Sequence, residues 1–218
     1  MEAVLVSSQA IKQAAADHPI HPLLEGRWSP RAFDAQPVEH ADLRSILEAA
    51  RWSASGGNKQ PWYFIVAERS DEEGFARLAG VLNPANAEWA AAAPVLMLAA
   101  AKTTTDDGQP NPYGFYDAGL AVQNLTVQAT ALGLHVHQMG GFSAERARAE
   151  FAIPQGYTPV VVAAVGYLGD PNVLPERRRE AELTPRVRKP LRDFVFEQTW
   201  GRPAAFIEQL PDSQITQP

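Results

Sequence analysis

The sequence contains no cysteine, and it has neither a long uninterrupted apolar run nor an excess of positive charge. Without cysteine, disulfide bonds, thiolate nucleophiles and cysteine-based metal sites are excluded. A formal net charge of −6 argues against a protein whose main partner is a nucleic-acid backbone, because that role requires clustered basic residues. The longest apolar run, residues 89–101, is interrupted by Pro94 and is shorter than the ~20 residues that span a bilayer.

Residues 1–10 carry no basic stretch ahead of an apolar core, so the sequence predicts no secretory signal. We therefore expect a cytoplasmic protein without a membrane or nucleic-acid partner. With 218 residues, of which 45% are hydrophobic, the chain is long enough to bury the core of one full domain.

Helical and strand-like patterns both occur along the chain, which predicts the α+β class. Leu43, Ile46, Leu47 and Ala50 recur at helical spacing, and short apolar runs predict buried strands. The predicted helices cover residues 38–50, 71–80, 88–93, 115–132 and 143–151, and the predicted strands cover residues 63–67, 95–101, 135–138 and 160–168. Residues 102–112 are predicted to form a loop, and residues 191–201 one late extended segment.

The segment RWSPRAF, residues 27–33, places two guanidinium groups around one hydroxyl. Arg27 and Arg31 flank Ser29 just before a predicted helix. Because an arginine fork matches phosphate oxygens and a hydroxyl adds another donor, this segment is a candidate phosphate clamp. For so short a pattern taken alone, a solvated turn with two surface arginines is the favoured interpretation.

The segment SASGGNKQPW, residues 53–62, connects a predicted helix to a predicted strand. Gly56 and Gly57 allow the backbone to approach a ligand closely. Asn58 and Gln60 offer both donors and acceptors, as the edge of a heteroaromatic ring with C=O and N–H groups requires. The alternative is an ordinary polar connection, since Gly, Ser and Asn are typical of loops.

Other charged and titratable patterns are weaker. The segment RVRKP, residues 186–190, and the arginine run at residues 177–179 are each typical of solvated charges when taken alone. His135 and His137 share one face of a predicted strand, as a metal pair does, but no third ligand is close in sequence. A structural role is therefore favoured for both, and no metal site is predicted.

Several aromatic residues are candidates either for packing or for contact with a ligand. Trp28, Trp52 and Trp62 are interpreted first as core or interface packing. The residues after the predicted loop are candidates either for substrate contact or for packing: Tyr113, Phe115 and Tyr116.

Taken in order, these segments resemble the FMN-dependent nitroreductase family. Its members carry an R-x-S-x-R-x-F element, an S-x-x-N-x-Q-P-W element leading into a strand, a G-G-F or E-G-F turn after a strand, and a late arginine pair. The matching residues are Arg27, Ser29, Arg31 and Phe33; Ser55, Asn58, Gln60, Pro61 and Trp62; Gly140, Gly141 and Phe142; and Arg186 and Arg188. Their consistent order over residues 22–201 carries more weight than any single motif.

The resemblance implies a three-layer α/β/α sandwich with a central mixed, mostly antiparallel sheet. It also implies an intertwined homodimer with exchanged C-terminal arms and two FMN sites, each built from both chains. The corresponding division of the chain is an N-terminal helical segment over residues 1–21, an FMN-binding domain with the dimer arm over residues 22–201, and a polar tail over residues 202–218.

For the site, the resemblance implies that Arg27 and Ser29 hold the FMN phosphate with Arg188, and that Arg186 is a further candidate. Arg31 would lie near flavin N1 and O2. Asn58 would bond the ring edge or ribityl chain, with Gln60 or Ser55 as further partners. The backbone of Gly140 and Gly141 would face flavin N5, and Trp28 and Met139 are included as neighbouring cofactor contacts.

The implied activity is a ping-pong transfer of two electrons from NADH or NADPH through FMN to a nitroaromatic, quinone or related small-molecule acceptor. Many members place a glutamate at the position of Gly140, so the handling of nicotinamide and substrate departs from that pattern here. No side chain stands out as a general acid. The alternatives are a flavin-storage or sensor protein without turnover, and a specialised reductive dehalogenase or flavin-fragmenting branch.

Overall fold

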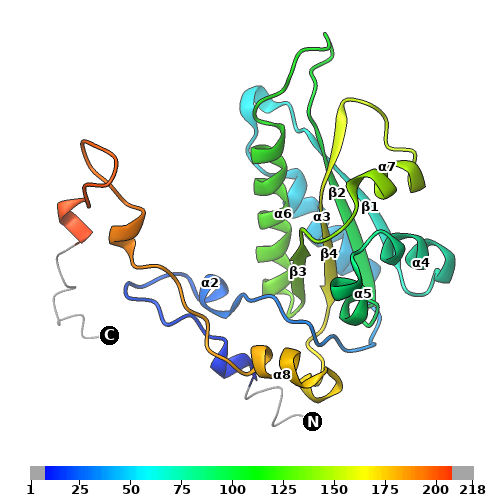
Figure 1. Ribbon diagram of the computed structural model, residues 1–218, viewed down its shortest axis with the longest axis horizontal. Coiled ribbons are helices and arrows are strands. Elements are labelled where there is room, and N and C mark those ends of the chain that lie inside the picture. The colour runs from blue at the N-terminus through cyan, green and yellow to red at the C-terminus, as the bar shows by residue number, and fades with distance from the viewer. Residues whose placement is uncertain (1–7, 208–218) are drawn as a thin grey trace.

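The structure is a computed structural model that describes residues 8–207, in which one antiparallel sheet is covered by helices on both faces (Figure 1). The sheet has the order β1-β2-β4-β3. Its strands are β1 Trp62–Glu68, β2 Val95–Lys102, β3 His135–Met139 and β4 Tyr157–Gly166. All three pairings between these strands are antiparallel.

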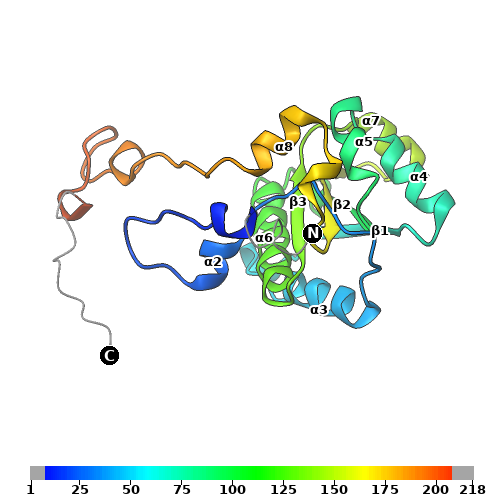
Figure 2. The same ribbon diagram turned by 90° about the horizontal axis from the view of Figure 1, so that it is seen from below.

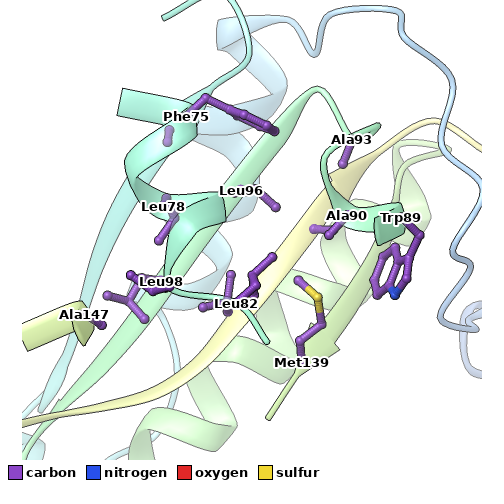
Figure 3. Packing of buried hydrophobic residues seen from close by; sticks show 14 of the residues in the cluster. Phe75, Leu78, Leu82, Trp89, Ala90, Ala93, Leu96, Leu98, Met139 and Ala147 are labelled. Atoms are coloured by element: carbon purple, nitrogen blue, oxygen red, sulfur yellow. The ribbon is translucent and has the colours of Figure 1, made fainter. Parts of the chain in front are cut away.

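The two central strands are apolar on both sides, because each side is covered. In β2, Leu96 and Leu98 belong to one core cluster, whereas Val95 and Met97 belong to the other. Figure 3 shows the first cluster, in which side chains of the sheet meet those of α4 and α5. The three layers confirm the predicted α+β class and sandwich.

The helices on the first face are α4 Glu72–Gly80, α5 Pro84–Ala90 and α7 Ala144–Glu150, and those on the second face are α3 His40–Arg51 and α6 Gly114–Ala131 (Figures 1 and 2). Shorter elements are α2 Pro22–Gly26 and α8 Glu176–Glu182, with 3₁₀ turns at Gly56–Asn58, Pro171–Val173, Leu191–Asp193 and Ala205–Ile207. Residues 8–11 of the predicted N-terminal helical segment are helical, whereas residues 1–7 lie outside the described chain.

Local signals set most helix ends. The side chains of Asp71 and Ser143 accept hydrogen bonds from the first turns of α4 and α7, as expected of N-caps. The predicted helix at residues 88–93 was wrong in position, because Asn83 caps a helix that begins at Pro84. Strand β4 begins at Tyr157, three residues before its predicted start.

The late extended segment predicted at residues 191–201 was also wrong. Residues 191–193 form a 3₁₀ turn, and Phe196 pairs with Pro203 across a turn. Residues 183–207, here called the C-terminal arm, run away from the sheet and its helices (Figure 2). Several of its apolar side chains are exposed: Val187, Phe194, Trp200 and Phe206.

No helix within residues 8–207 is long and apolar enough to cross a membrane.

Candidate active site

Residues 27–31 lie along strand β3. The Trp28 ring meets the His135 ring edge-on at 5.9 Å, and its Nε1–H donates to Gln9 Oε1 at 2.9 Å. Farther along the strand, His137 Nδ1 lies 2.8 Å from the Pro30 carbonyl oxygen, to which it donates as the Nδ1–H tautomer. Trp28 is buried and its N–H already donates a hydrogen bond, so its ring packs in the core, which is one of the two interpretations given above. Its contact with a cofactor stays a prediction.

Burial keeps both strand histidines neutral. It lowers the pKa of His135 to about 4, and the Arg27 charge adds to this effect. Burial likewise lowers the pKa of His137 to about 4, although the bond to Pro30 works in the opposite direction. Within residues 8–207 no group of three or more potential ligands is arranged to hold a metal ion.

Arg27, the first residue of this segment, lies close to Arg186 and Arg188, and Arg186 follows it by 159 residues in the sequence. Arg27 Nη1 lies 3.4 Å from Ser29 Oγ, and Arg186 donates to the carbonyl oxygens of Arg27 at 2.6 Å and Glu25 at 2.5 Å. Burial lowers the pKa of Arg27, and the Arg188 charge lowers it further. Burial also lowers the pKa of Arg186, with added repulsion from Arg27 and Arg188.

No carboxylate within residues 8–207 pairs with this arginine cluster, since none of Arg27, Arg186 and Arg188 forms a salt bridge there. Arg186 Nε is buried and has no hydrogen-bond partner among residues 8–207. The cluster borders a cavity of about 630 Å³ whose wall includes Leu24 and Phe194. Repelling, partly desolvated guanidinium groups beside a cavity fit a bound phosphate.

Arg31 lies apart from this cluster and faces a carboxylate that the sequence did not single out. Glu182, in α8, is 1% exposed. Its Oε2 accepts a hydrogen bond from the Arg31 backbone N–H at 3.1 Å, and its Oε1 lies 3.4 Å from Arg31 Nη1. Burial raises the pKa of Glu182, while Arg31 and Lys12 oppose the rise.

The turn after β3 offers free backbone donors. Gly140 is exposed and a Cβ there would meet no atom within 4 Å. A Cβ on Gly141 would meet the side-chain amides of Asn83 and Asn86, so any larger residue here requires these side chains to shift. The amide N–H groups of Gly140 and Gly141 form no hydrogen bond within residues 8–207. The Met139 side chain is buried in the first core cluster (Figure 3), and its cofactor contact stays a prediction.

The loop of residues 55–60 is held in an uncommon backbone conformation. Asn58 and Gln60 have φ angles of 55° and 48°, next to Gly57 at 58°. Ser55 Oγ accepts from the Gln60 backbone N–H at 3.0 Å, and Gln60 Nε2 donates to Asn58 Oδ1 at 3.1 Å. Left-handed backbone at residues other than glycine costs energy, and these contacts help to hold it in the loop. Its contact with a cofactor stays a prediction.

One chain does not bring this loop to the arginine cluster. The Gly56 N–H donates to Asp117 Oδ2 at 3.1 Å, in the first turn of α6, whereas Trp28 meets His135 just beyond the last turn. Helix α6 has 18 residues and is therefore about 27 Å long. The loop and the cluster lie toward opposite ends of this helix (Figure 1).

Sequence reasoning missed Glu182, Lys12 and Asp117. Nothing local marks Glu182 or Lys12, because their partners lie about 150 residues or more away in sequence. Asp117 carried a usable signal, since it is the single charged residue in the apolar stretch of α6 and is buried there.

One further expectation needs correction. Arg178, assigned to a solvated charge run, contacts Glu88 at 2.8 Å and the Ala85 carbonyl oxygen at 2.5 Å, and thereby fastens α8 to α5. Trp52 is largely exposed in this chain, so its packing at an interface stays a prediction, and Tyr113, Phe115 and Tyr116 are exposed as well, so their contact with a substrate stays a prediction.

Comparison with known proteins shows the family to which this chain belongs. The model of the Nitroreductase family matches residues 24–167, which is more than half of the chain. The chain belongs to the nitroreductase family. The resemblance inferred from the sequence is thereby confirmed, and the four-stranded sandwich above is the fold of a family member.

Relatives with names point to oxidoreductases. The oxygen-insensitive NAD(P)H nitroreductase of Salmonella typhimurium is 30% identical over 210 residues, which cover 72% of this chain and 94% of that protein. A putative NADH dehydrogenase/NAD(P)H nitroreductase of Archaeoglobus fulgidus is 27% identical over 150 residues, or 66% of this chain and 82% of that protein.

Solved structures agree with this family. A crystal structure described as an oxidoreductase containing FMN is 36% identical with a TM-score of 0.81, and covers 88% of this chain and 96% of that chain. A nitroreductase family protein from Clostridium difficile is 27% identical with a TM-score of 0.65, and covers 81% and 96% respectively.

Proposed function

We propose that this protein is an oxidoreductase that binds FMN and transfers two electrons from NADH or NADPH to a small-molecule acceptor, such as a nitroaromatic or a quinone. The observation that carries the proposal is that, within residues 8–207, the arginine cluster has no carboxylate partner, and that residues 27–31 run from it along β3 toward a turn with two backbone N–H groups that form no hydrogen bond. Family membership and the FMN-containing structural relative support the same cofactor.

The phosphate end of FMN fits the arginine cluster. Arg27, Arg186 and Arg188 would bind the phosphate, with the Ser29 hydroxyl as a further donor. A dianion would relieve the mutual repulsion of the guanidinium groups and give the buried Arg186 Nε a partner. A terminal phosphate of this kind is present in FMN, whereas no G-x-G-x-x-G element for a dinucleotide follows a strand in this sequence.

When bound, FMN supplies the chemistry of accepting a hydride and passing it on. The residues of this chain would prepare that step. Gly140 and Gly141 would present N–H donors to the reacting edge of the ring, and Arg31 would place a cation where reduction adds negative charge. No acidic side chain stands in the turn, since Gly140 takes that position, so protons would come from solvent.

The complete site would require two copies of this chain. Ser55, Asn58 and Gln60 lie at the far end of α6 from the arginine cluster, so they would bind the flavin held by a partner. The C-terminal arm supports this arrangement, because its exposed apolar side chains, among them Trp200 at 93% exposure, lack a surface to cover them within residues 8–207. Sedimentation should give a dimer, and an FMN-loaded monomer at micromolar concentration would contradict it.

The test of function starts with the purified protein, which should be yellow and release FMN on denaturation. Stopped-flow mixing with NADH or NADPH should bleach the flavin, and a quinone or nitroaromatic should restore the colour without ternary-complex kinetics. Released FAD, or a colourless protein that cannot be loaded with FMN, would overturn the proposal. Bound flavin that neither nucleotide reduces would identify a storage protein instead.

A further inference from the structure

Glu182 is a buried carboxylate, and burying its charge is expected to lower the stability of the folded protein. It lies at the end of α8, is 1% exposed, and contacts Arg31 through both oxygens. Taking a carboxylate out of water costs several kcal/mol, and replacing a buried ion pair by apolar residues is often neutral or stabilising. The structure points to a role in positioning rather than to a stabilising contact.

The two oxygens of the Glu182 carboxylate contact different parts of Arg31. The shorter one, at 3.1 Å, holds the Arg31 backbone, whereas the guanidinium contact at 3.4 Å engages one of its five N–H donors. The remaining donors of Arg31 stay available, and its side chain is 32% exposed. Glu182 therefore holds the backbone of Arg31 in place while its negative charge offsets part of the positive charge of the guanidinium group.

The surroundings of Glu182 hold it in this place. Lys12 Nζ donates to the carbonyl oxygens of Ala181 at 2.6 Å and Thr184 at 2.5 Å, on either side of Glu182 in sequence. The same ammonium lies 5.5 Å from the Trp28 ring centroid, which connects the end of α8 to residues 27–31. Arg178 fastens the helix to α5. The carboxylate has a fixed position from which to act on Arg31.

We infer that Glu182 is a positioning residue that holds Arg31 at the flavin site and limits how much of its positive charge the bound flavin experiences. This inference rests on the proposed function, since it concerns FMN bound beside Arg31. A cation near the ring favours the reduced, anionic flavin. Removing the offsetting carboxylate should therefore favour the reduced form further.

The first test is Glu182→Gln, which keeps an oxygen to accept the Arg31 backbone N–H but removes the charge. The ratio of the affinities for reduced and oxidised FMN should rise about tenfold, which is a midpoint potential about 30 mV higher for a two-electron couple. Affinity for oxidised FMN should change much less. Glu180→Gln, at an exposed position of the same helix, is the matched control and should leave the potential unchanged.

The same substitution in an Arg31→Gln background shows whether Glu182 acts through Arg31. Positioning predicts that the shift then falls below about twofold, as a double-mutant cycle reports for coupled residues. An equal shift in both backgrounds would mean that the carboxylate acts on the flavin directly, and would overturn the inference. Glu182→Asp keeps the charge but shortens the reach, so it should raise the potential by less than Gln does, and it replaces Gln if that variant does not fold.

The outcomes separate the two proposals. Wild-type protein that cannot be loaded with FMN overturns the proposed function and this inference together. Wild-type protein that binds FMN and is reduced, with an unchanged potential in Glu182→Gln, overturns the inference alone.

Discussion

Acid should destabilise this protein between pH 6.5 and pH 4 through two partly buried histidines of β3. His135 packs against Trp28, and His137 packs against Trp89 with ring centroids 4.4 Å apart while donating to Pro30. Burial lowers the pKa of each from 6.5 to about 4. Both must stay neutral in the folded protein, whereas the unfolded chain takes up protons below pH 6.5.

The magnitude follows from proton linkage. A group with a lowered pKa in the folded state contributes its full stability above the unfolded value of 6.5 and loses it as the pH falls toward the folded value of about 4. At pH 5 the unfolded form of each histidine is almost fully protonated and the folded form almost not. The loss relative to pH 8 is then about 2 kcal/mol for each histidine, or about 4 kcal/mol for both.

The assay is urea denaturation at pH 8, 7, 6 and 5, with protein and FMN concentrations held fixed because ligand and partner binding both shift stability. His135→Phe keeps a ring beside Trp28 but cannot titrate, so the loss between pH 8 and pH 5 should halve. His18→Asn, at an exposed position, should leave the loss unchanged. The raised pKa of Glu182 changes the free energy of unfolding in the opposite direction, because its buried charge is neutralised as the pH falls. Each variant is therefore compared with the wild type at the same pH, which cancels this contribution.

If wild type and His135→Phe lose the same free energy of unfolding from pH 8 to pH 5, the linkage argument is refuted. Because His137 holds Pro30, and Arg27 and Arg31 flank that residue within the same segment, we also expect FMN to dissociate more readily over the same pH range.

Three further predictions concern the site. Arg27→Ala should weaken FMN binding by about 10- to 100-fold in a fluorescence titration, which is the scale of a lost charge-assisted hydrogen bond. The control Arg177→Ala, at an exposed position, should leave the affinity unchanged, and equal effects would mean that the phosphate does not bind at the cluster. Arg31→Ala should lower the FMN midpoint potential more than it weakens binding of oxidised FMN; a collapse of binding at unchanged potential would move Arg31 from the ring to the phosphate. Gly141→Ala should destabilise the protein by about 1–3 kcal/mol, because its Cβ displaces the side chains of Asn83 and Asn86 from their hydrogen bonds to the Asn86 N–H and the Gly141 carbonyl oxygen. Gly140→Ala should be tolerated in thermal unfolding, and the reverse order would be inconsistent with the turn described.

The sequence predicted the local elements well where periodicity and caps agree. Spacing of apolar residues located α3 and α6, and Asp71 and Ser143 marked the starts of α4 and α7. It failed for α5, where an alanine-rich stretch concealed the Asn83–Pro84 start, and for the arm, where apolar residues resembled a strand. Apolar composition alone does not fix a strand when its pairing partner lies outside the segment.

What the sequence determined by itself was the family. Ordered motifs with fixed spacing also predict Arg27, Ser29, Asn58 and the Gly140 turn as site residues, because each motif encodes a local geometry that short-range sterics and hydrogen bonding can build. The fold decided which distant charges meet. Many carboxylates could have faced Arg31, and only the packing of α8 selects Glu182, across 151 residues of chain. Only the three-dimensional arrangement likewise places the loop of residues 55–60 an α6 length away from the arginine cluster, because a helix of 18 residues is stiff and separates what its two ends hold.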